Sequence, residues 1–174
     1  MTSEIIKILS DEHKNILIVV DVLSNQCRKM SGNEIDKDFF LGVIDFIRNY
    51  ADKFHHAKEE DLLFKEFCKN AEKGDIHCNP VDQMLYEHDI GRGFVKQMEE
   101  GVKENNQRKI IEGANGYASL IREHIFKEDN ILYPMTDESL DEKTKQKMLW
   151  QFKEIERKKK KEQEKYLNFV RTIK

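Results

Sequence analysis

Apolar residues recur at intervals of three and four along most of the chain, the spacing that places side chains on one face of an α-helix. Four such stripes predict helices over residues 3–30, 36–70, 80–104 and 107–133. Thr2 or Ser3 can cap the first helix, and Ser31-Gly32-Asn33 supplies its stop. Pro80 falls early in the third helix, and we expect Pro134 to close the fourth.

The short links between these stripes predict an all-α fold, an up-down-up-down four-helix bundle with antiparallel neighbours. Residues 1–135 would form the bundle, and residues 136–174 an additional long C-terminal helix. We expect this last helix to pack across the open side of the bundle. Its apolar stripe is interrupted by a basic run at 157–161, which suggests that the end projects. Such a run is usually a solvated face, and a homodimer or protein contact is the alternative.

Composition narrows the class of protein. With 174 residues the chain fits one domain, and a net charge of −3 implies no general attraction to nucleic acid or to an anionic membrane. No apolar run approaches the roughly 18 to 20 residues that span a bilayer. The N-terminus lacks the form of a signal peptide, and three cysteines without a C-x-x-C pair suggest reduced thiols. We therefore expect a cytoplasmic protein.

Two ten-residue segments resemble each other closely. Residues 55–64 and 124–133 agree at His, Lys and Glu and end in an acid, a polar residue, two aliphatics and an aromatic. His55 and Glu59 are four residues apart, as are His124 and Glu128, so each pair leaves one helix face. This repetition indicates a metal site.

A shorter repeated motif, Glu-His, places a histidine early in the first and third helices, at Glu12-His13 and Glu87-His88. In an antiparallel bundle, an early residue of one helix lies level with a late residue of the next. Four imidazoles and two carboxylates can therefore converge, and their burial would be costly without a cation. We expect two metal ions bridged by Glu59 and Glu128, with iron, manganese or zinc as the metals that suit such ligands. The histidines are His13, His55, His88 and His124.

Each of these residues also has an ordinary structural interpretation, because a lone histidine on an apolar face is more often a hydrogen-bonded core residue. His56 and Glu60 share the four-residue spacing, but the repeat aligns only His55 and Glu59 with the later pair. We therefore expect His56 to be solvated or to support a ligand. His77 is interpreted as incidentally exposed. Glu12 and Glu87 could support the ligands or lie at the surface.

These motifs resemble those of hemerythrin-like proteins, the HHE cation-binding family. The resemblance covers about residues 3 to 135 and rests on both Glu-His pairs and both His-x-x-x-Glu segments. It implies a non-haem di-iron centre with two iron ions, bridged by two carboxylates and an oxo or hydroxo group. The implied ligands are His13, His55, Glu59, His88, His124 and Glu128.

The chain departs from the oxygen-carrying branch of that family, which uses five histidines and His-x-x-x-x-Asp in its last motif. Glu128 stands at spacing four instead, so the pattern is closer to the stress-response and repair branch. The resemblance implies binding of, or reaction with, dioxygen, nitric oxide or peroxide, in oxidative or nitrosative stress or in iron handling. A sensing module without turnover and a zinc-binding helical scaffold are the alternatives. Gly91, three residues after His88, leaves room for a diatomic ligand or allows close helix packing.

Overall fold

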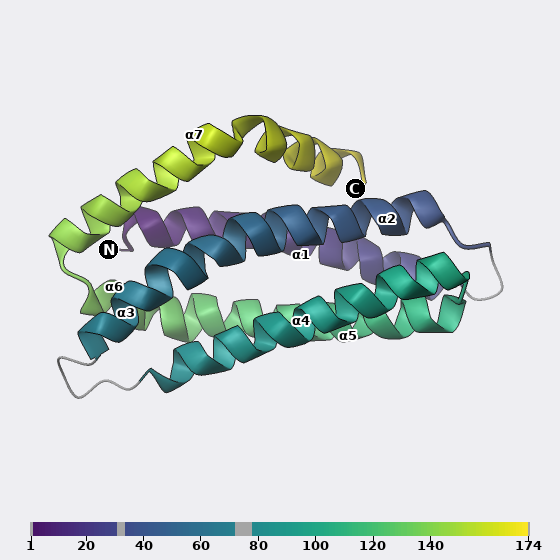
Figure 1. Ribbon diagram of the computed structural model, residues 1–174, viewed down its shortest axis with the longest axis horizontal. Helices are drawn as coiled ribbons and strands as arrows, with labels where there is room; N and C mark the ends of the chain where they lie inside the picture. The colour runs from purple at the N-terminus through teal and green to yellow at the C-terminus, as the bar shows by residue number, and fades with distance from the viewer. Residues whose placement is uncertain (1, 31–33, 72–77, 174) are drawn as a thin grey trace.

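The computed structural model describes residues 2–30, 34–71 and 78–173, and all regular secondary structure in these ranges is helical (Figure 1). The predicted all-α class is therefore confirmed. The first helix, α1, covers Glu4–Lys29, as its apolar stripe predicts. The expected stop at 31–33 and His77 lie outside the described residues.

The second long helix has the predicted extent but changes its winding along its length. It begins as α2, continues through two π-helical segments and ends as α3, and Asp36 caps it by accepting a hydrogen bond from the backbone of Phe39 at 3.0 Å. Its parts are α2 (Lys37–Phe46), η1 (Ile47–His56), η2 (Glu59–Leu63) and α3 (Phe64–Ala71). Because π-helical turns are rare and concentrate at functional sites, η1 and η2 direct attention to the residues between Ile47 and Leu63.

The third helix, α4, covers Asn79–Glu104 and carries Pro80 in its first turn, as predicted. It ends at Asn105, whose φ of 54° lies in the left-handed region that asparagine tolerates. Asn106 then caps α5 (Gln107–Lys127) by accepting a hydrogen bond from the backbone of Lys109. These two short capping signals turn the chain between α4 and α5.

The prediction that Pro134 closes the fourth helix is wrong. A third π-helical segment, η3 (Glu128–Leu132), follows α5, and the amide of Tyr133 donates to the carbonyl of Glu128 five residues earlier. A new α-helix, α6 (Tyr133–Ser139), begins there. Pro134 lies in its first turn, where its missing N–H is not needed, so the helix continues past it.

The buried apolar residues form two clusters with a polar layer between them. The larger cluster includes Val19, Phe46 and Tyr117, and the smaller includes Leu9 and Phe67. Each of the four long helices contributes to this layering, because each carries inward polar residues between its apolar ones. The buried polar residues include Glu12, His13, His55, His56, Lys58, Glu59, Glu87, His88, His124 and Glu128. The core therefore surrounds a polar layer with apolar side chains on both sides.

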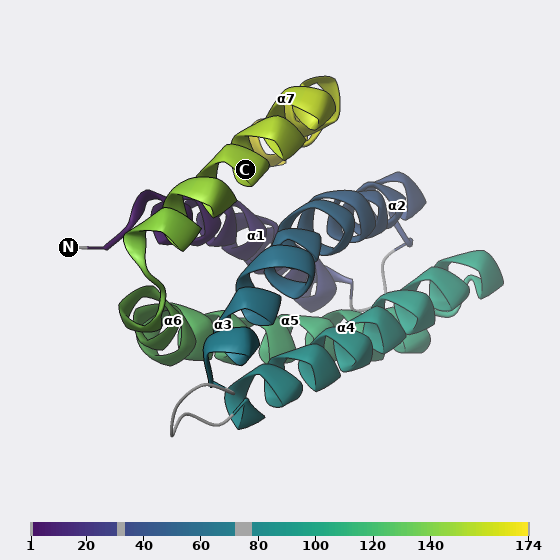
Figure 2. The same cartoon turned by 60° about the vertical axis from the view of Figure 1, so that its left-hand side comes forward.

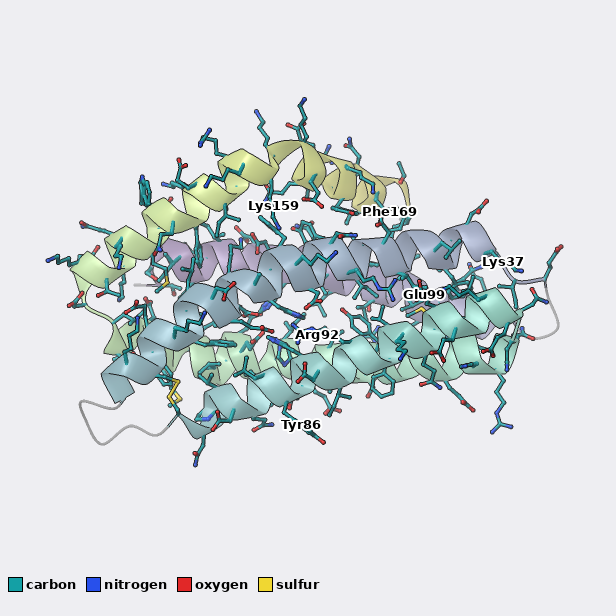
Figure 3. All side chains as sticks on the ribbon, in the orientation of Figure 1. Lys37, Tyr86, Arg92, Glu99, Lys159 and Phe169 are labelled. Carbon is teal, nitrogen blue, oxygen red and sulfur yellow. A yellow bond between two sulfur atoms is a disulfide. The ribbon has the colours of Figure 1, made fainter. Side chains whose placement is uncertain are left out.

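The C-terminal helix, α7 (Glu142–Thr172), runs over α1 and α2 along their outer side (Figures 1 and 2). Phe152 packs in the smaller cluster, and Tyr166 and Val170 pack in the larger one. Figure 3 shows Phe169 on the side of α7 that faces α2, where Gly42 leaves space for its ring. The expectation that this end projects is therefore wrong. The division at residue 135 and a partner contact through α7 stay predictions.

The basic run at 157–161 lies on α7 between Phe152 and Tyr166, the residues that pack in the two apolar clusters, and it is mostly exposed to solvent. Lys159 donates to the backbone carbonyl of Lys53 at 2.8 Å, and it points from α7 toward the bundle in Figure 3. Arg157 pairs with Glu154 on its own helix at 3.0 Å. The apolar residues on both sides of the run hold the helix down, so the charged segment needs no partner to stay in place.

The expectation of reduced cysteines is wrong for two of the three. Cys68 in α3 and Cys78, which precedes α4, form a disulfide with Cα atoms 5.5 Å apart. Their separation of ten residues gave no C-x-x-C signal, and the pairing depends on how the helices are joined. Cys27 is a buried free thiol. Among the described residues, no helix is long and apolar enough to cross a membrane.

Candidate metal centre

The polar layer contains the four predicted histidines, and a carboxylate lies beside Nδ1 of each one. Nδ1 of His13 on α1 lies 3.1 Å from Oδ1 of Asp129, and Nδ1 of His55 lies 2.9 Å from Oε2 of Glu12. An Nδ1–H that donates to a carboxylate fixes the plane of the imidazole ring and leaves the Nε2 lone pair free. Each ring is thus held so that Nε2 faces the interior.

The histidines of α4 and α5 are held in the same way, one of them by a carboxylate of the first repeat. Nδ1 of His88 on α4 lies 2.7 Å from Oε1 of Glu60, and Nδ1 of His124 on α5 lies 2.9 Å from Oε2 of Glu87. The two Nε2 atoms of His88 and His124 face each other at 3.0 Å. Two nitrogen atoms at this distance share one proton at most, and their two lone pairs could contact one cation.

Glu59 and Glu128 occupy the middle of the layer and are fully buried. The two oxygens of Glu128 lie 3.2 Å from Nε2 of His13 and 3.3 Å from Nε2 of His124. Oε2 of Glu59 lies 3.6 Å from Nε2 of His55 and 3.7 Å from Nε2 of His88. Each glutamate therefore lies between a histidine of the first two long helices and a histidine of the last two, the position of a carboxylate that bridges two cations.

Several of these central atoms have no hydrogen-bond partner among the described residues. They are Nε2 of His55, Oε2 of Glu59 and both carboxylate oxygens of Glu128, because the imidazole contacts above lack hydrogen-bond geometry. A buried polar atom without a partner costs about 1–3 kcal/mol, and more when it is charged. All four atoms are electron-pair donors. The residues present therefore fit a bound cation, which would contact each of them.

The electrostatics of the layer are dominated by burial and by the two central carboxylates. Burial and the charge of Glu128 raise the pKa of Glu59 well above its usual range. Burial opposes ionisation of Glu128 as well, but His124 and His13 outweigh it and hold its pKa well below normal. Burial likewise lowers the pKa of His13, yet Asp129 and Glu128 raise it to about 9. The imidazolium charges balance the carboxylates, a role that a bound cation would take over.

The ligand-type atoms fall into two clusters, and together these contain all six predicted residues. One consists of His13, His55, Glu59 and Glu128, and the other of His56, His88 and His124. Within each cluster, one ligand atom per residue lies within 4.8 Å of the others. The structure thus brings the six residues to one level of the bundle, although they come from α1, η1, η2, α4, α5 and η3.

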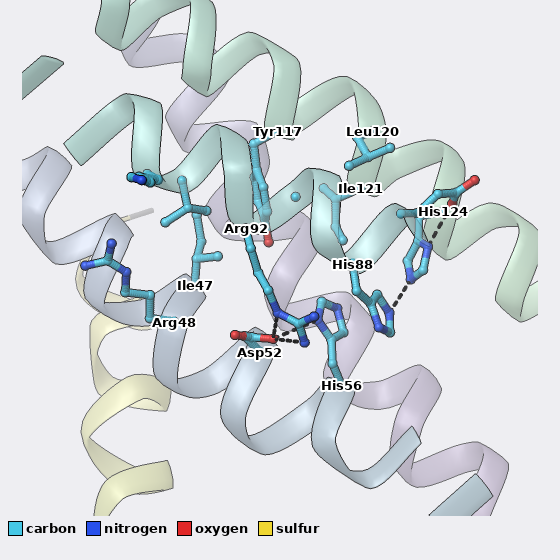
Figure 4. A pocket seen from close by; sticks show the side chains of 14 residues that line it. Ile47, Arg48, Asp52, His56, His88, Arg92, Tyr117, Leu120, Ile121 and His124 are labelled. Carbon is cyan, nitrogen blue, oxygen red and sulfur yellow. Dashed lines mark hydrogen bonds and ion pairs between the residues drawn. The ribbon is translucent and has the colours of Figure 1, made fainter. Parts of the chain in front are cut away.

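His56 is buried beside His88, which excludes the solvated alternative and leaves the one in which it supports a ligand. It is 6% exposed, and its ring stacks on that of His88 with centroids 3.8 Å apart. Figure 4 shows His56 beside His88, close to Asp52, whose Oδ1 lies 3.7 Å from its Nδ1. The repeat gave no signal for it, since Ile125 occupies the equivalent position. The π-helical winding of η1 also changes the angle between successive side chains that the prediction assumed.

A family model described as the hemerythrin HHE cation binding domain matches residues 4–136. The chain belongs to this family. No curated protein and no solved structure matches the chain at a significant level. A hemerythrin HHE domain is a cation-binding helical domain, and the two buried clusters of this one could hold metal.

In this hemerythrin HHE chain, three further residues that were not among the predicted ones contact the site or its supporting glutamates. Tyr133 donates its hydroxyl to Oε1 of Glu59 at 2.5 Å, and its ring is parallel to that of His13 with centroids 5.4 Å apart. Lys58 pairs with Glu12, and Lys127 pairs with Glu87. The sequence did contain a signal for the two lysines, because both repeats have a lysine before the central glutamate and an acidic residue after it.

Proposed function

We propose that this chain holds two iron ions, bridged by Glu59 and Glu128. The observation that carries the proposal is the common orientation of four imidazoles, each turned by a carboxylate so that Nε2 faces two buried glutamates. Mixed imidazole and carboxylate ligands suit iron, and also manganese or zinc. The proposed ligands are His13, His55, Glu59, His88, His124 and Glu128.

An iron pair supplies one-electron redox steps and a position at which dioxygen, nitric oxide or peroxide binds. The protein's part is to fix and shield the ligands. Asp129 and Glu60 orient His13 and His88, while burial in the polar layer excludes bulk water. The hydroxyl of Tyr133 holds a proton at Oε1 of Glu59, the one proton donor observed on a central carboxylate within the described part of the chain.

We propose that the centre binds or reacts with dioxygen, nitric oxide or peroxide in the cytoplasm, in oxidative or nitrosative stress or in iron handling. The four long helices would run up, down, up and down around it. The path in Figure 1 supports this order, since α1 meets α2 and α4 meets α5 at one end of the bundle, whereas α3 and α4 approach at the other. The order places early and late histidines at one level.

Stopped-flow mixing of the ferrous protein with dioxygen, nitric oxide and peroxide tests this function. We expect a rapid absorbance change with at least one of the three, which the His124→Ala variant loses because a ligand nitrogen is removed. A stable reversible adduct would assign a binding or sensing role, and repeated turnover would assign an enzyme. An iron-loaded protein that responds to none of them contradicts the proposal. A protein that takes up zinc but no iron would be a zinc scaffold.

A further inference from the structure

A cavity of about 270 Å³ borders the second histidine cluster (Figure 4). It lies between η1, α4 and α5, and one end is formed by His56, His88 and His124. Apolar side chains make up much of its remaining wall, namely Ile47, Val95, Leu120 and Ile121 together with the ring of Tyr117. The cavity is thus an apolar space that ends on three imidazoles.

The size of the cavity exceeds what a diatomic molecule needs. One water occupies a share of about 30 Å³ in the liquid, and dioxygen or nitric oxide is of similar size. Pockets for small organic ligands begin at roughly 300 Å³. At about 270 Å³ the cavity falls near the lower end of that class, large enough for an organic molecule of about ten non-hydrogen atoms.

One polar group on the wall has no partner. The hydroxyl of Tyr117 is buried, and it makes no hydrogen bond to any described residue. Figure 4 shows the ring along the cavity, with its hydroxyl directed to the side on which Asp52 and His56 lie. Burial raises the pKa of Tyr117, so the group keeps its proton and can donate. A buried hydroxyl of this kind is expected to bond to the occupant of the cavity.

The arginines on the wall do not favour a charged occupant, because their charges are already paired. Arg48 makes two 2.9 Å hydrogen bonds to the carboxylate of Glu99. Arg92 donates to Oδ1 of Asp52 at 2.7 Å and 3.0 Å and to Oε1 of Glu60 at 2.8 Å. The other cation of the lining, Lys96, is exposed to solvent. The buried part of the wall therefore presents apolar groups and paired charges, which suit a neutral ligand.

We propose that this cavity binds a neutral organic molecule with an alkyl or aryl body and one hydroxyl or hydroperoxide head. The body occupies the apolar space, and the head accepts a hydrogen bond from Tyr117. The head would also lie near the three histidines of the cavity end, and only its approach to a metal held there rests on the proposed function. The apolar wall and the hydroxyl of Tyr117 can bind the molecule without a metal. The occupant is therefore larger than the diatomic ligands expected of the centre.

Gly91 offers a way to fill the cavity. It lines the space beside His88, and a Cβ built on it would lie 3.7 Å from side-chain atoms of Leu120 and Tyr117, an ordinary contact. Close packing of helix backbones therefore does not require glycine at this position. A larger side chain would extend into the cavity. Gly93, on the same helix, is exposed and has no atom within 4 Å of its built Cβ, which makes it the matched control.

The test is titration of the full-length protein, as purified and with its metal content measured, with 2-phenyl-2-propanol, followed by calorimetry. We expect saturable binding at one site per chain. Gly91→Leu should weaken binding by at least about tenfold, because the side chain takes up the space, whereas Gly93→Leu should stay within about twofold. Tyr117→Phe should weaken binding of the alcohol by about fivefold, but not that of isopropylbenzene, which lacks the hydroxyl.

Absence of saturable binding to the wild-type protein overturns the inference. So does a Gly91→Leu variant that unfolds at the wild-type temperature and binds the alcohol equally well. If Gly91→Leu fails to fold, the Tyr117→Phe comparison decides, because a variant that loses no affinity for the alcohol contradicts the proposed head group. Binding of the alcohol by a wild-type protein that takes up no metal would refute the proposed function and leave this inference intact.

Discussion

Both histidine clusters take residues from the two repeats, but one is sealed and the other borders a cavity. In the first, His13 and His55 are 1% and 0% exposed, and Tyr133 closes the space against His13. In the second, His88 and His124 lie at the end of the 270 Å³ cavity, next to His56. The two clusters thus differ in composition as well as in surroundings, since the first contains two histidines and two glutamates and the second three histidines. The surroundings decide where a ligand can approach.

One substitution within the repeat accounts for much of the difference. Tyr133 bonds to Glu59 through its hydroxyl, whereas its counterpart Phe64 only stacks against His88 with centroids 6.3 Å apart. His56 adds an imidazole to the second cluster, where the other repeat has Ile125. The first cluster is therefore built to hold its atoms in place. The second has the wall and the space for an incoming molecule.

The two repeats also differ in what covers them from outside. Lys58, which pairs with Glu12, is fully buried, and its ammonium lies 5.2 Å from the ring centroid of Phe152 on α7. Lys127, which pairs with Glu87, keeps 28% of its side chain exposed. The C-terminal helix thus covers only one of two equivalent ion pairs. The same pair should therefore contribute differently to stability in the two repeats.

The largest expected effect comes from Glu128, a residue of the first cluster that also contacts the second. Glu128→Ala removes the carboxylate that contacts both His13 and His124, so we expect bound iron to fall from two per chain to less than one. Glu123→Ala, an exposed glutamate on α5, is the control and should keep two. Metal analysis of both purified variants checks this. Retention of two ions by Glu128→Ala would mean that the residue does not bridge.

The next effect separates the buried ion pair from the exposed one. Glu12→Gln leaves the ammonium of Lys58 buried without a charged partner, which should lower the free energy of unfolding by about 3–5 kcal/mol. Glu87→Gln leaves Lys127 partly solvated and should cost about 1 kcal/mol. Urea denaturation of the two variants measures both values. Equal losses would contradict the idea that α7 makes the repeats unequal.

A smaller effect is expected at the residue that seals the first cluster. Tyr133→Phe removes the hydrogen bond to Glu59 and should lower the free energy of unfolding by about 1–3 kcal/mol, because a buried oxygen loses its donor. Binding of 2-phenyl-2-propanol should be unchanged, since the cavity lies at the other cluster. Thermal unfolding and calorimetry test the two parts. Weakened alcohol binding would show that the clusters do not act separately.

The smallest effect on stability is expected at Ser10, which contacts the carboxylate that orients a histidine and does not contact the histidine itself. Ser10 donates its hydroxyl to Oδ1 of Asp129 at 2.7 Å, and Asp129 in turn orients His13. Ser10→Ala should cost about 0.5–1.5 kcal/mol, with both iron ions retained. Chemical denaturation and metal analysis of the variant provide the test. Loss of one iron ion would contradict this expectation, because it would show that Ser10 is needed to hold the metal and does more than stabilise the fold.

The four-helix core and the common level of the six candidate ligands follow from periodicity and from the repeat. The features that the sequence pattern did not predict depend on π-helical winding and on contacts between residues that no local motif connects. Pro134 was expected to stop a helix, yet α6 begins at Tyr133 after the π-helical segment η3, which places the proline in a first turn where it is tolerated. The choice between a solvated and a supporting His56 stayed open because η1 is π-helical, which changes the angle between successive side chains. The Cys68–Cys78 disulfide depends on how α3 and α4 approach, which no local motif records.

Iron content after anaerobic reconstitution with ferrous iron tests the central claim most directly. The buried glutamates and the four oriented imidazoles predict two iron ions per chain and, after oxidation, the near-ultraviolet absorption of a coupled ferric pair. The spectrum should be lost together with the metal in Glu128→Ala. Fewer than one iron per chain in the reconstituted wild-type protein, or a colourless protein that holds only zinc, would contradict the account.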